Sequence, residues 1–261
     1  MELGLHGKSC VVTGASQGIG LAVARRLTDE GARVLLVARS ADALTAAARE
    51  LGEVAAALAL DITHADAPDR IADAARDHAG EVDVLVNSAG MSAVKPLETL
   101  TADDYQEHFD ISVLAPLRLM QRLVPAMAAR GNGAVVNVAS IAGRRPSPTN
   151  LAYSVAKAAE LNLTRAYADH YASQGVRINA VNPGPVASPL WVGPGGLADQ
   201  QAAARGITPA QAMAEVDAAI PQGRYGTPEE IAGVIVFLCS AQAANVVGAG
   251  WQVDGGAHPV I

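Results

Sequence analysis

The chain has 261 residues, half of them apolar and 17% charged, which is the balance of a globular protein and excludes a disordered one. Its net charge of −7 and the absence of Lys or Arg runs argue against nucleic-acid binding. No apolar stretch reaches the roughly 20 residues that a membrane-spanning helix needs. We therefore expect a cytoplasmic protein whose partners are neither nucleic acids nor membranes.

The two cysteines and six histidines carry no metal signature. Cys10 and Cys239 lie in separate apolar runs, so we expect buried, reduced thiols. The histidines form no H-E-x-x-H or similar pattern, and no Cys/His cluster has the spacing of metal ligands. The sequence therefore predicts no metal site.

Strand and helix signals alternate along the whole chain. Short β-branched or apolar runs predict strands at Ser9–Thr13, Arg33–Val37, Val54–Leu60, Val82–Val86, Ala134–Val138, Arg177–Val181 and Gly250–Val253. Strands that are nearly all apolar, with helices between them, indicate a parallel sheet covered on both faces. We expect a single α/β domain over residues 1–261, a Rossmann-type doubly wound sheet of about seven strands.

Helix boundaries are marked by capping residues. Thr101 opens a T-x-x-D box before a long helix that Gly131 ends, and Gly31 ends the first helix. Thr227-Pro228-Glu229-Glu230 supplies a cap, an N1 proline and two acids. The clearest helices are predicted at Leu21–Glu30, Ala152–Asp169, Pro209–Ala219 and Pro228–Ser240.

The turn after the first strand is rich in glycine. It reads TGASQGIG over residues 13–20 and leads into the first helix. Glycines there permit a tight turn and close approach of the backbone to a pyrophosphate, and the helix N-terminus supplies free N–H groups. Such a turn can be merely structural, but its place between the first strand and first helix favours a dinucleotide site.

Tyr153 and Lys157 project from the same face of a predicted helix because they are four residues apart. A phenol has a pKa near ~10 and is a poor base at neutral pH, whereas a neighbouring ammonium favours the phenolate. Ser140 ends the fifth strand, where its hydroxyl can hold a substrate oxygen. A lone Y-x-x-x-K pattern is common by chance, but the three residues together predict acid/base chemistry on a carbonyl or alcohol.

Taken together, these motifs resemble the classical short-chain dehydrogenases/reductases, with a layout close to the 3-oxoacyl-[acyl-carrier-protein] reductases. The resemblance covers essentially all of the chain. It rests on TGASQGIG at 13–20, Asp61, NSAG at 87–90, Ser140, YSVAK at 153–157, NPG at 182–184 and VDGG at 253–256.

The resemblance implies an NAD(P)-dependent oxidoreductase that interconverts a ketone or aldehyde and an alcohol, with a small-molecule substrate. Tyr153 would be the general acid/base, Lys157 would bind the nicotinamide ribose, and the pro-S hydrogen would be transferred. Relatives form tetramers through the region of the last helix and last strand, so we expect a homotetramer or homodimer. Residues implied for the dinucleotide are Gly14, Ser16, Gln17, Gly18, Ile19, Gly20, Arg39, Asp61, Ile62, Asn87, Ala89, Gly90, Tyr153, Lys157, Pro183, Gly184, Val186 and Ser188.

Cofactor choice depends on the end of the second strand. NAD-dependent enzymes place an acid there for the ribose hydroxyls, whereas Ala38 and Arg39 occupy it here. A guanidinium binds a 2′-phosphate, so we expect NADP(H), with NAD(H) possible if Arg39 is only a surface residue. Asp61 resembles the acceptor for the adenine amino group, or it is simply a turn or cap residue.

Ser112 is the main departure from the family pattern. It stands where relatives have an Asn that holds a water in the proton relay from the catalytic Lys. A hydroxyl still donates and accepts, so the relay could work, run slowly or fail. The alternatives are therefore a non-catalytic dinucleotide-binding regulator and an NAD-dependent alcohol dehydrogenase. An extended-family epimerase would need a different glycine spacing and a longer C-terminal part.

The stretch from about 183 to 221 is rich in Gly, Pro and Ala and follows a late strand. Long insertions at the carboxyl edge of such a sheet cover ligands, so we expect a substrate lid. The residues predicted to contact substrate are Ser140, Ile141, Tyr153 and Trp191, with further lining candidates at Ser92, Arg145, Asn150, Gly184, Leu190 and Met213. The sequence does not identify the substrate.

Overall fold

The protein is built on one seven-stranded parallel sheet. The computed structural model describes residues 2–259. The strands lie in the order β3-β2-β1-β4-β5-β6-β7, so the chain reverses its direction of winding between β1 and β4. Their bounds are β1 Ser9–Thr13, β2 Arg33–Ala38, β3 Ala55–Ala59, β4 Val84–Asn87, β5 Gly133–Val138, β6 Val176–Pro183 and β7 Gly250–Val253. This order confirms the predicted doubly wound fold.

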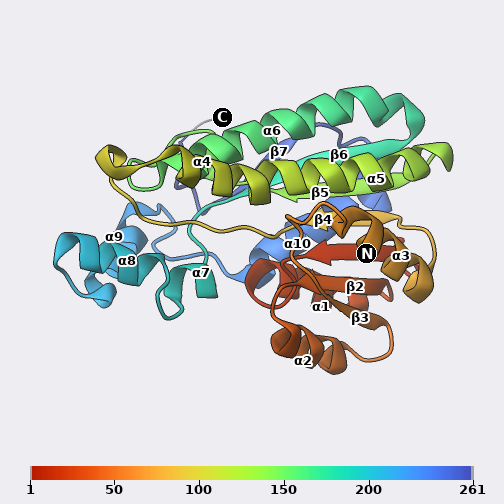
Figure 1. Ribbon diagram of the computed structural model, residues 1–261, viewed down its shortest axis with the longest axis horizontal. Coiled ribbons are helices and arrows are strands. Elements are labelled where there is room, and N and C mark those ends of the chain that lie inside the picture. The colour runs from red at the N-terminus through yellow and green to blue at the C-terminus, as the bar shows by residue number, and fades with distance from the viewer. Residues whose placement is uncertain (1, 260–261) are drawn as a thin grey trace.

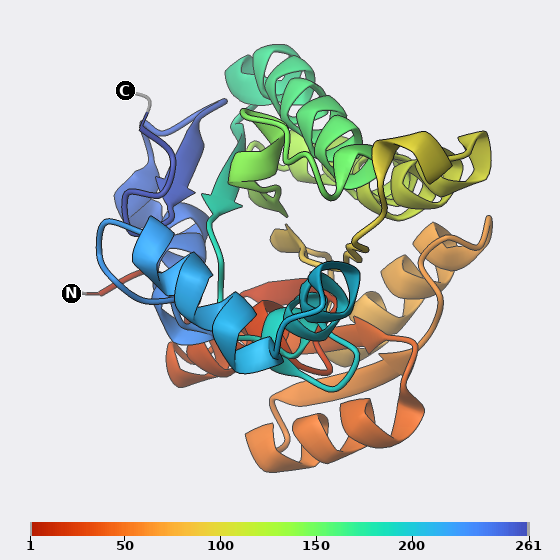
Figure 2. The ribbon, with the colours of Figure 1, turned by 90° about the vertical axis from the view of Figure 1, so that its left-hand side faces the viewer.

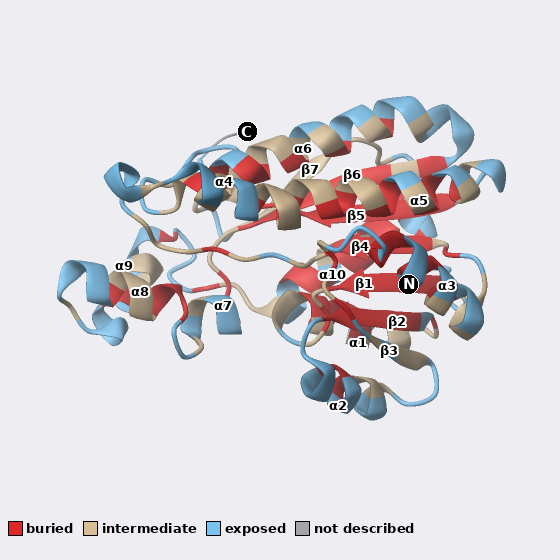
Figure 3. Ribbon diagram, viewed as in Figure 1, coloured by how far each residue is buried: buried red, intermediate tan, exposed pale blue. Residues whose placement is uncertain are grey.

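Helices cover both faces of the sheet (Figure 1). One face carries α1 Gly18–Asp29, α2 Ala41–Leu51 and α10 Pro228–Cys239; the other carries α3 Ala67–Ala79, α5 Ala115–Ala129 and α6 Leu151–Tyr171. Neighbouring strand residues point to opposite faces, so Val12 joins the first apolar cluster and Val11 the second. The central strands are therefore buried, whereas α2 and α9 are largely exposed (Figure 3).

The helix predicted between Thr101 and Gly131 has an irregular middle. It consists of α4 Ala102–Phe109, a π-helical turn at Asp110–Leu114, and α5. Thr101 and Asp104 form the expected capping box, and Gly131 has a positive φ of 67°. A π turn inserts one extra residue and often marks a functional position in a helix. Ser112 lies in this turn.

The segment after β6 is more helical than its composition suggests. Its last helix, α9 Pro209–Ala219, has the predicted bounds, but α7 Pro189–Val192 and α8 Leu197–Arg205 were not predicted. Glycine and proline favour turns, which hid these two short helices in the sequence. When the carboxyl ends of the strands face the viewer, α8 and α9 cross in front of the sheet (Figure 2).

Element ends differ from prediction by a few residues. The first helix begins at Gly18 and not at Leu21, because two glycines in its first turn weaken the helix signal. The third strand is one residue shorter at each end than predicted. Within residues 2–259, no helix combines the length and apolarity needed to cross a membrane.

Candidate active site

A cavity of about 690 Å³ opens at the carboxyl edge of the sheet. Its wall extends from the glycine-rich turn after β1, past the end of β4, to Tyr153 and Lys157 on α6. In open α/β sheets, ligands bind at the point where the strand order reverses, and this cavity includes that point. It is also within the size range of small-molecule and cofactor sites.

The glycine-rich turn is held tightly against the end of β4. A Cβ on Gly14 would lie 2.8 Å from Ala89 Cα, and one on Gly20 would lie 2.4 Å from the Gly14 carbonyl oxygen. Thr13 Oγ1 accepts hydrogen bonds from the N–H groups of Ser88 and Ala89 at 3.1 and 3.2 Å. Close backbone packing therefore requires glycine at positions 14 and 20 of this turn.

The start of α1 faces the same cavity. Gln17 is the N-cap of α1, and its side chain makes no capping hydrogen bond. The first N–H groups of a helix lack intrahelical partners and carry a partial positive charge. This arrangement is suited to bind an anionic group such as a pyrophosphate.

The far end of the cavity is bordered by Arg39 and Asp61. Arg39 is exposed at the end of β2, next to Ser40, the N-cap of α2, whose hydroxyl makes no capping bond. Asp61 Oδ1 accepts from the N–H and Oγ1 of Thr63 at 2.9 and 2.8 Å. The hydrogen bond from the Thr63 N–H is the largest of the effects that lower the pKa of Asp61, so this residue stays ionised.

Tyr153 and Lys157 lie one turn apart near the start of α6. Lys157 Nζ is 5.7 Å from the centroid of the Tyr153 ring. It donates to the Val138 carbonyl oxygen and to Glu160 Oε2, both at 2.8 Å. Burial alone would lower the pKa of Lys157, but attraction to Glu160 and Tyr153 outweighs burial and raises it. Lys157 is therefore an ammonium at neutral pH.

Ser140 completes this end of the cavity. It follows β5 and is 8% exposed. Its Oγ accepts a hydrogen bond from the Ala142 N–H at 3.1 Å. Because a hydroxyl also has one hydrogen to donate, Ser140 remains able to donate to an oxygen in the cavity.

Ser112 lies behind the cavity wall. Its side chain is fully buried, it does not line the cavity, and its Oγ finds no hydrogen-bond partner among residues 2–259. The π turn that holds it packs against α6. Any contact between Ser112 and a ligand must therefore be indirect.

The outer wall joins three segments by hydrogen bonds. Asn150 Nδ2 donates to Ser92 Oγ at 3.1 Å, and the Val94 N–H donates to Gln200 Oε1 of α8 at 2.8 Å. The Oδ1 atom of Asn150 is buried and unpartnered within the described part of the chain. Trp191 stands edge-on to Tyr225, with 5.4 Å between ring centroids.

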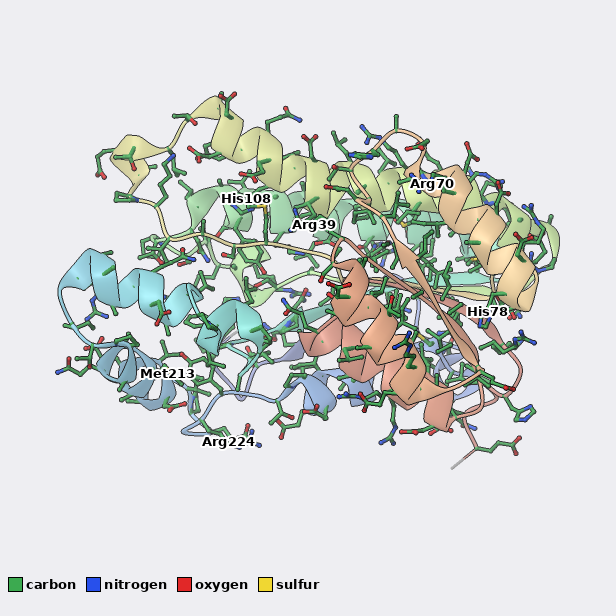
Figure 4. All side chains as sticks on the ribbon, turned by 60° about the horizontal axis from the view of Figure 1, so that its bottom comes forward. Arg39, Arg70, His78, His108, Met213 and Arg224 are labelled. Carbon is green, nitrogen blue, oxygen red and sulfur yellow. The ribbon has the colours of Figure 1, made fainter. Side chains whose placement is uncertain are left out.

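Most of the residues predicted for the site line this one cavity. All four residues predicted to contact substrate do so, and among the dinucleotide candidates the exception is Asn87. Asn87 is buried and donates to Asn137 Oδ1 at 2.8 Å, so it supports the wall from behind. Arg145 and Met213 also lie outside the lining; Met213 is on α9, apart from Arg39 and His108 (Figure 4).

Two buried polar residues that contact Lys157 or Tyr153 were not predicted. Glu160 contacts Lys157, and His108 of α4 meets the Tyr153 ring edge-on, with 6.0 Å between centroids. A charged residue three positions after Lys157, on the face that also carries Ala156 and Thr164, was the available signal for Glu160. Residues missed in the lining include Ser40, Met91, Ser147, Thr149 and Gln201.

Comparison with known proteins agrees with this geometry. The family described as "Enoyl-(Acyl carrier protein) reductase" matches residues 14–258. Sorbitol dehydrogenase of Cereibacter sphaeroides is 36% identical over 254 residues, 97% of this chain and 98% of that one. The 3-oxoacyl-[acyl-carrier-protein] reductase of Vibrio harveyi is 32% identical over 99% of this chain and 100% of its own.

Solved structures give the same result. L-sorbose reductase from Gluconobacter frateurii, complexed with NADPH and L-sorbose, superimposes with a TM-score of 0.92 at 34% identity, covering 100% of both chains. Fold and cavity thus define an oxidoreductase that uses a nicotinamide dinucleotide. The chain belongs to the short-chain dehydrogenase/reductase family, as its motifs predicted.

Proposed function

We propose that the protein is an NADP(H)-dependent enzyme that interconverts a carbonyl and an alcohol, with Tyr153 as its general acid/base. The observation that carries this proposal is that Ser140, Tyr153 and Lys157 line the same cavity as the glycine-rich turn. The dinucleotide would lie along Gly14–Gly20, with its nicotinamide end toward Tyr153. When bound, it would supply the hydride for reduction and accept it in oxidation.

Side chains of the protein bind the substrate oxygen and transfer the proton. In reduction, Tyr153 donates its hydroxyl proton to the carbonyl oxygen, and Ser140 donates a hydrogen bond to the same oxygen. The ammonium of Lys157 stabilises the phenolate that Tyr153 leaves behind. The proton is then restored from solvent; Ser112, without a ligand contact of its own, would assist only through water.

Preference for NADP(H) follows from the end of β2. Ala38 leaves no carboxylate to hold the ribose hydroxyls, while Arg39 and the Ser40 hydroxyl border the cavity there. A guanidinium binds a phosphate through two parallel hydrogen bonds. The NADPH complex of the sorbose reductase supports the same choice.

The outer wall favours a substrate with several hydroxyl groups, such as a polyol or the corresponding ketose. Five polar residues line this part of the cavity: Ser92, Ser147, Thr149, Asn150 and Gln201. Asn150 Nδ2 donates to Ser92 Oγ at 3.1 Å, which holds two of these polar side chains together at the wall. Relatives named for sorbitol and L-sorbose point the same way.

The helical segment at 183–221 would act as the substrate lid. Trp191 and Leu197 line the cavity from it, and Gln200 binds it to the backbone at Val94. We also infer assembly as a homotetramer or homodimer through α10 and β7, on the pattern of the family.

The proposal is tested by initial rates of NADPH oxidation with L-sorbose, other ketoses and a 3-oxoacyl thioester. We expect turnover of ketoses, and a fall of about 10²- to 10⁴-fold in kcat for Tyr153→Phe. Tyr171→Phe, on the same helix but away from the cavity lining, is the control and should retain wild-type rates. NADPH binding without Tyr153-dependent turnover would instead indicate a regulator.

A further inference from the structure

A buried carboxylate contacts the lysine of the reaction centre. Glu160 follows Lys157 by three residues on α6, and its Oε2 lies 2.8 Å from Lys157 Nζ. Their side chains are only 2% and 4% exposed. Replacing a buried ion pair by apolar residues is often neutral or even stabilising, so stability alone is a weak reason for this pair.

The pair fixes the direction of the Lys157 ammonium. Two acceptors engage Nζ from inside the protein, the Val138 carbonyl oxygen and Glu160 Oε2, both at 2.8 Å. An ammonium has three N–H donors, and Lys157 lines the cavity, so the third remains for a ligand. A Cβ on Gly90 would lie 3.9 Å from Nζ, which places the ammonium at the cavity wall near the end of β4.

Charged groups reach this centre from two helices. On α6 itself, Glu160 and Tyr153 raise the pKa of Lys157. Burial raises the pKa of Glu160, and the Lys157 ammonium at 2.8 Å opposes that rise and favours the carboxylate. From α4, His108 faces Tyr153, and burial is the main cause that lowers the pKa of His108, so it is neutral at neutral pH. The more distant acids on α4 that act on His108 are Asp104 and Glu107. From β5, the Val138 carbonyl oxygen accepts from Lys157 Nζ. The acid of the π turn, Asp110, instead accepts from Gln106 Nε2 at an exposed position.

We propose that Glu160 is a positioning residue: it aims the Lys157 ammonium at the cavity and offsets its charge beside Tyr153. This role of Glu160 rests on the proposed function only in taking Tyr153 as the general acid/base. A nearby negative charge opposes loss of the first proton from the Tyr153–Lys157 pair, whichever group releases it. Glu160 therefore helps to set the pH at which the enzyme oxidises an alcohol.

The test is Glu160→Gln, which keeps the size and an acceptor oxygen but removes the charge. Phenolate formation is followed by ultraviolet difference absorbance in the free protein, with Tyr153→Phe in each background to isolate the signal of Tyr153. We expect the midpoint to fall by about one pH unit, as for removal of one charge at a few ångströms. The pH profile of kcat/KM for alcohol oxidation should move in the same direction.

Two further variants make the result decisive. Asp169→Asn removes an exposed carboxylate from the same helix, where it pairs with Arg165, and should leave the midpoint unchanged. Glu160→Asp draws the charge back by one methylene and should give a smaller fall, which decides the question if Glu160→Gln does not fold. An unchanged or raised midpoint would overturn the proposal. Because this titration needs no turnover, an inactive protein would count against the proposed function alone.

Discussion

In the proposed function, Arg39 is the residue that sets the cofactor preference. It borders the cavity at the end of β2, where no carboxylate competes for the ribose hydroxyls. Charge-assisted hydrogen bonds contribute about 1.5–3 kcal/mol each, so Arg39→Ala should weaken NADPH binding by about 10- to 100-fold. NADH binding should change less than about twofold, because NADH has no 2′-phosphate. Fluorescence titration of both cofactors measures the two affinities.

Arg49, exposed near the end of α2, provides the matched control. Arg49→Ala removes the same charge from the same helical region without touching the cavity lining, and should leave both affinities unchanged. If the wild-type protein binds NADH as tightly as NADPH, the role given to Arg39 is wrong.

Among single residues, those that belong to sequence motifs were predictable, whereas the buried residues that hold them in place were not. Ser140, Tyr153 and Lys157 stand in fixed patterns, and the fold brings them to one cavity. Asn87 and Glu160 show the limit, since a motif does not reveal whether a side chain faces a ligand or a buried neighbour. Asn87 turns to Asn137, and Glu160 turns to Lys157, because packing behind the wall leaves each a partner there.

At the scale of elements, one arginine ties a strand to the end of a helix. Arg177 of β6 donates to the carbonyl oxygens of residues 238, 239, 240 and 243 at 2.8–3.3 Å, at the C-terminus of α10. The last carbonyls of a helix lack intrahelical partners, and the half-buried guanidinium of Arg177 supplies donors to them. Arg177 therefore fixes α10 against the sheet.

Arg177→Met should lower the free energy of unfolding by about 2–4 kcal/mol, because four partly buried carbonyl oxygens lose a charged donor. Urea denaturation followed by circular dichroism provides the measurement. Arg165→Met, which breaks an exposed pair with Asp169 on α6, should cost less than about 1 kcal/mol. Equal losses of unfolding free energy in the two variants would show that the hydrogen bonds of Arg177 to the end of α10 stabilise the fold no more than an exposed ion pair does.

Sequence periodicity predicted the strands and the long helices well, because buried parallel strands and amphipathic helices leave clear patterns. The failures have local causes. Short α7 and α8 lie in a stretch dominated by Gly and Pro, and the π turn at Ser112 leaves no mark in residue type. Tertiary contacts, such as Gln200 to Val94, position that segment.

Across the whole molecule, the reversal of strand order places the glycine-rich turn beside the end of β4, and β5 ends on the far side of β4. One cavity thereby meets residues from position 14 to position 201. A cavity that holds both the hydride donor and the carbonyl brings the reacting atoms together. The protein itself then needs to supply only the proton. We infer that the hydride passes directly between cofactor and substrate within this cavity.

Direct hydride transfer is tested by turnover of a ketose with NADPH that carries deuterium at the pro-S position of nicotinamide C4. We expect the deuterium on the new carbinol carbon of the product, detected by mass spectrometry, and unlabelled NADP⁺. NADPH with deuterium at the pro-R position is the control and should leave its label in the cofactor. Label in the product from the pro-R cofactor would overturn the pro-S assignment alone, whereas product without deuterium from either labelled cofactor would rule out direct transfer.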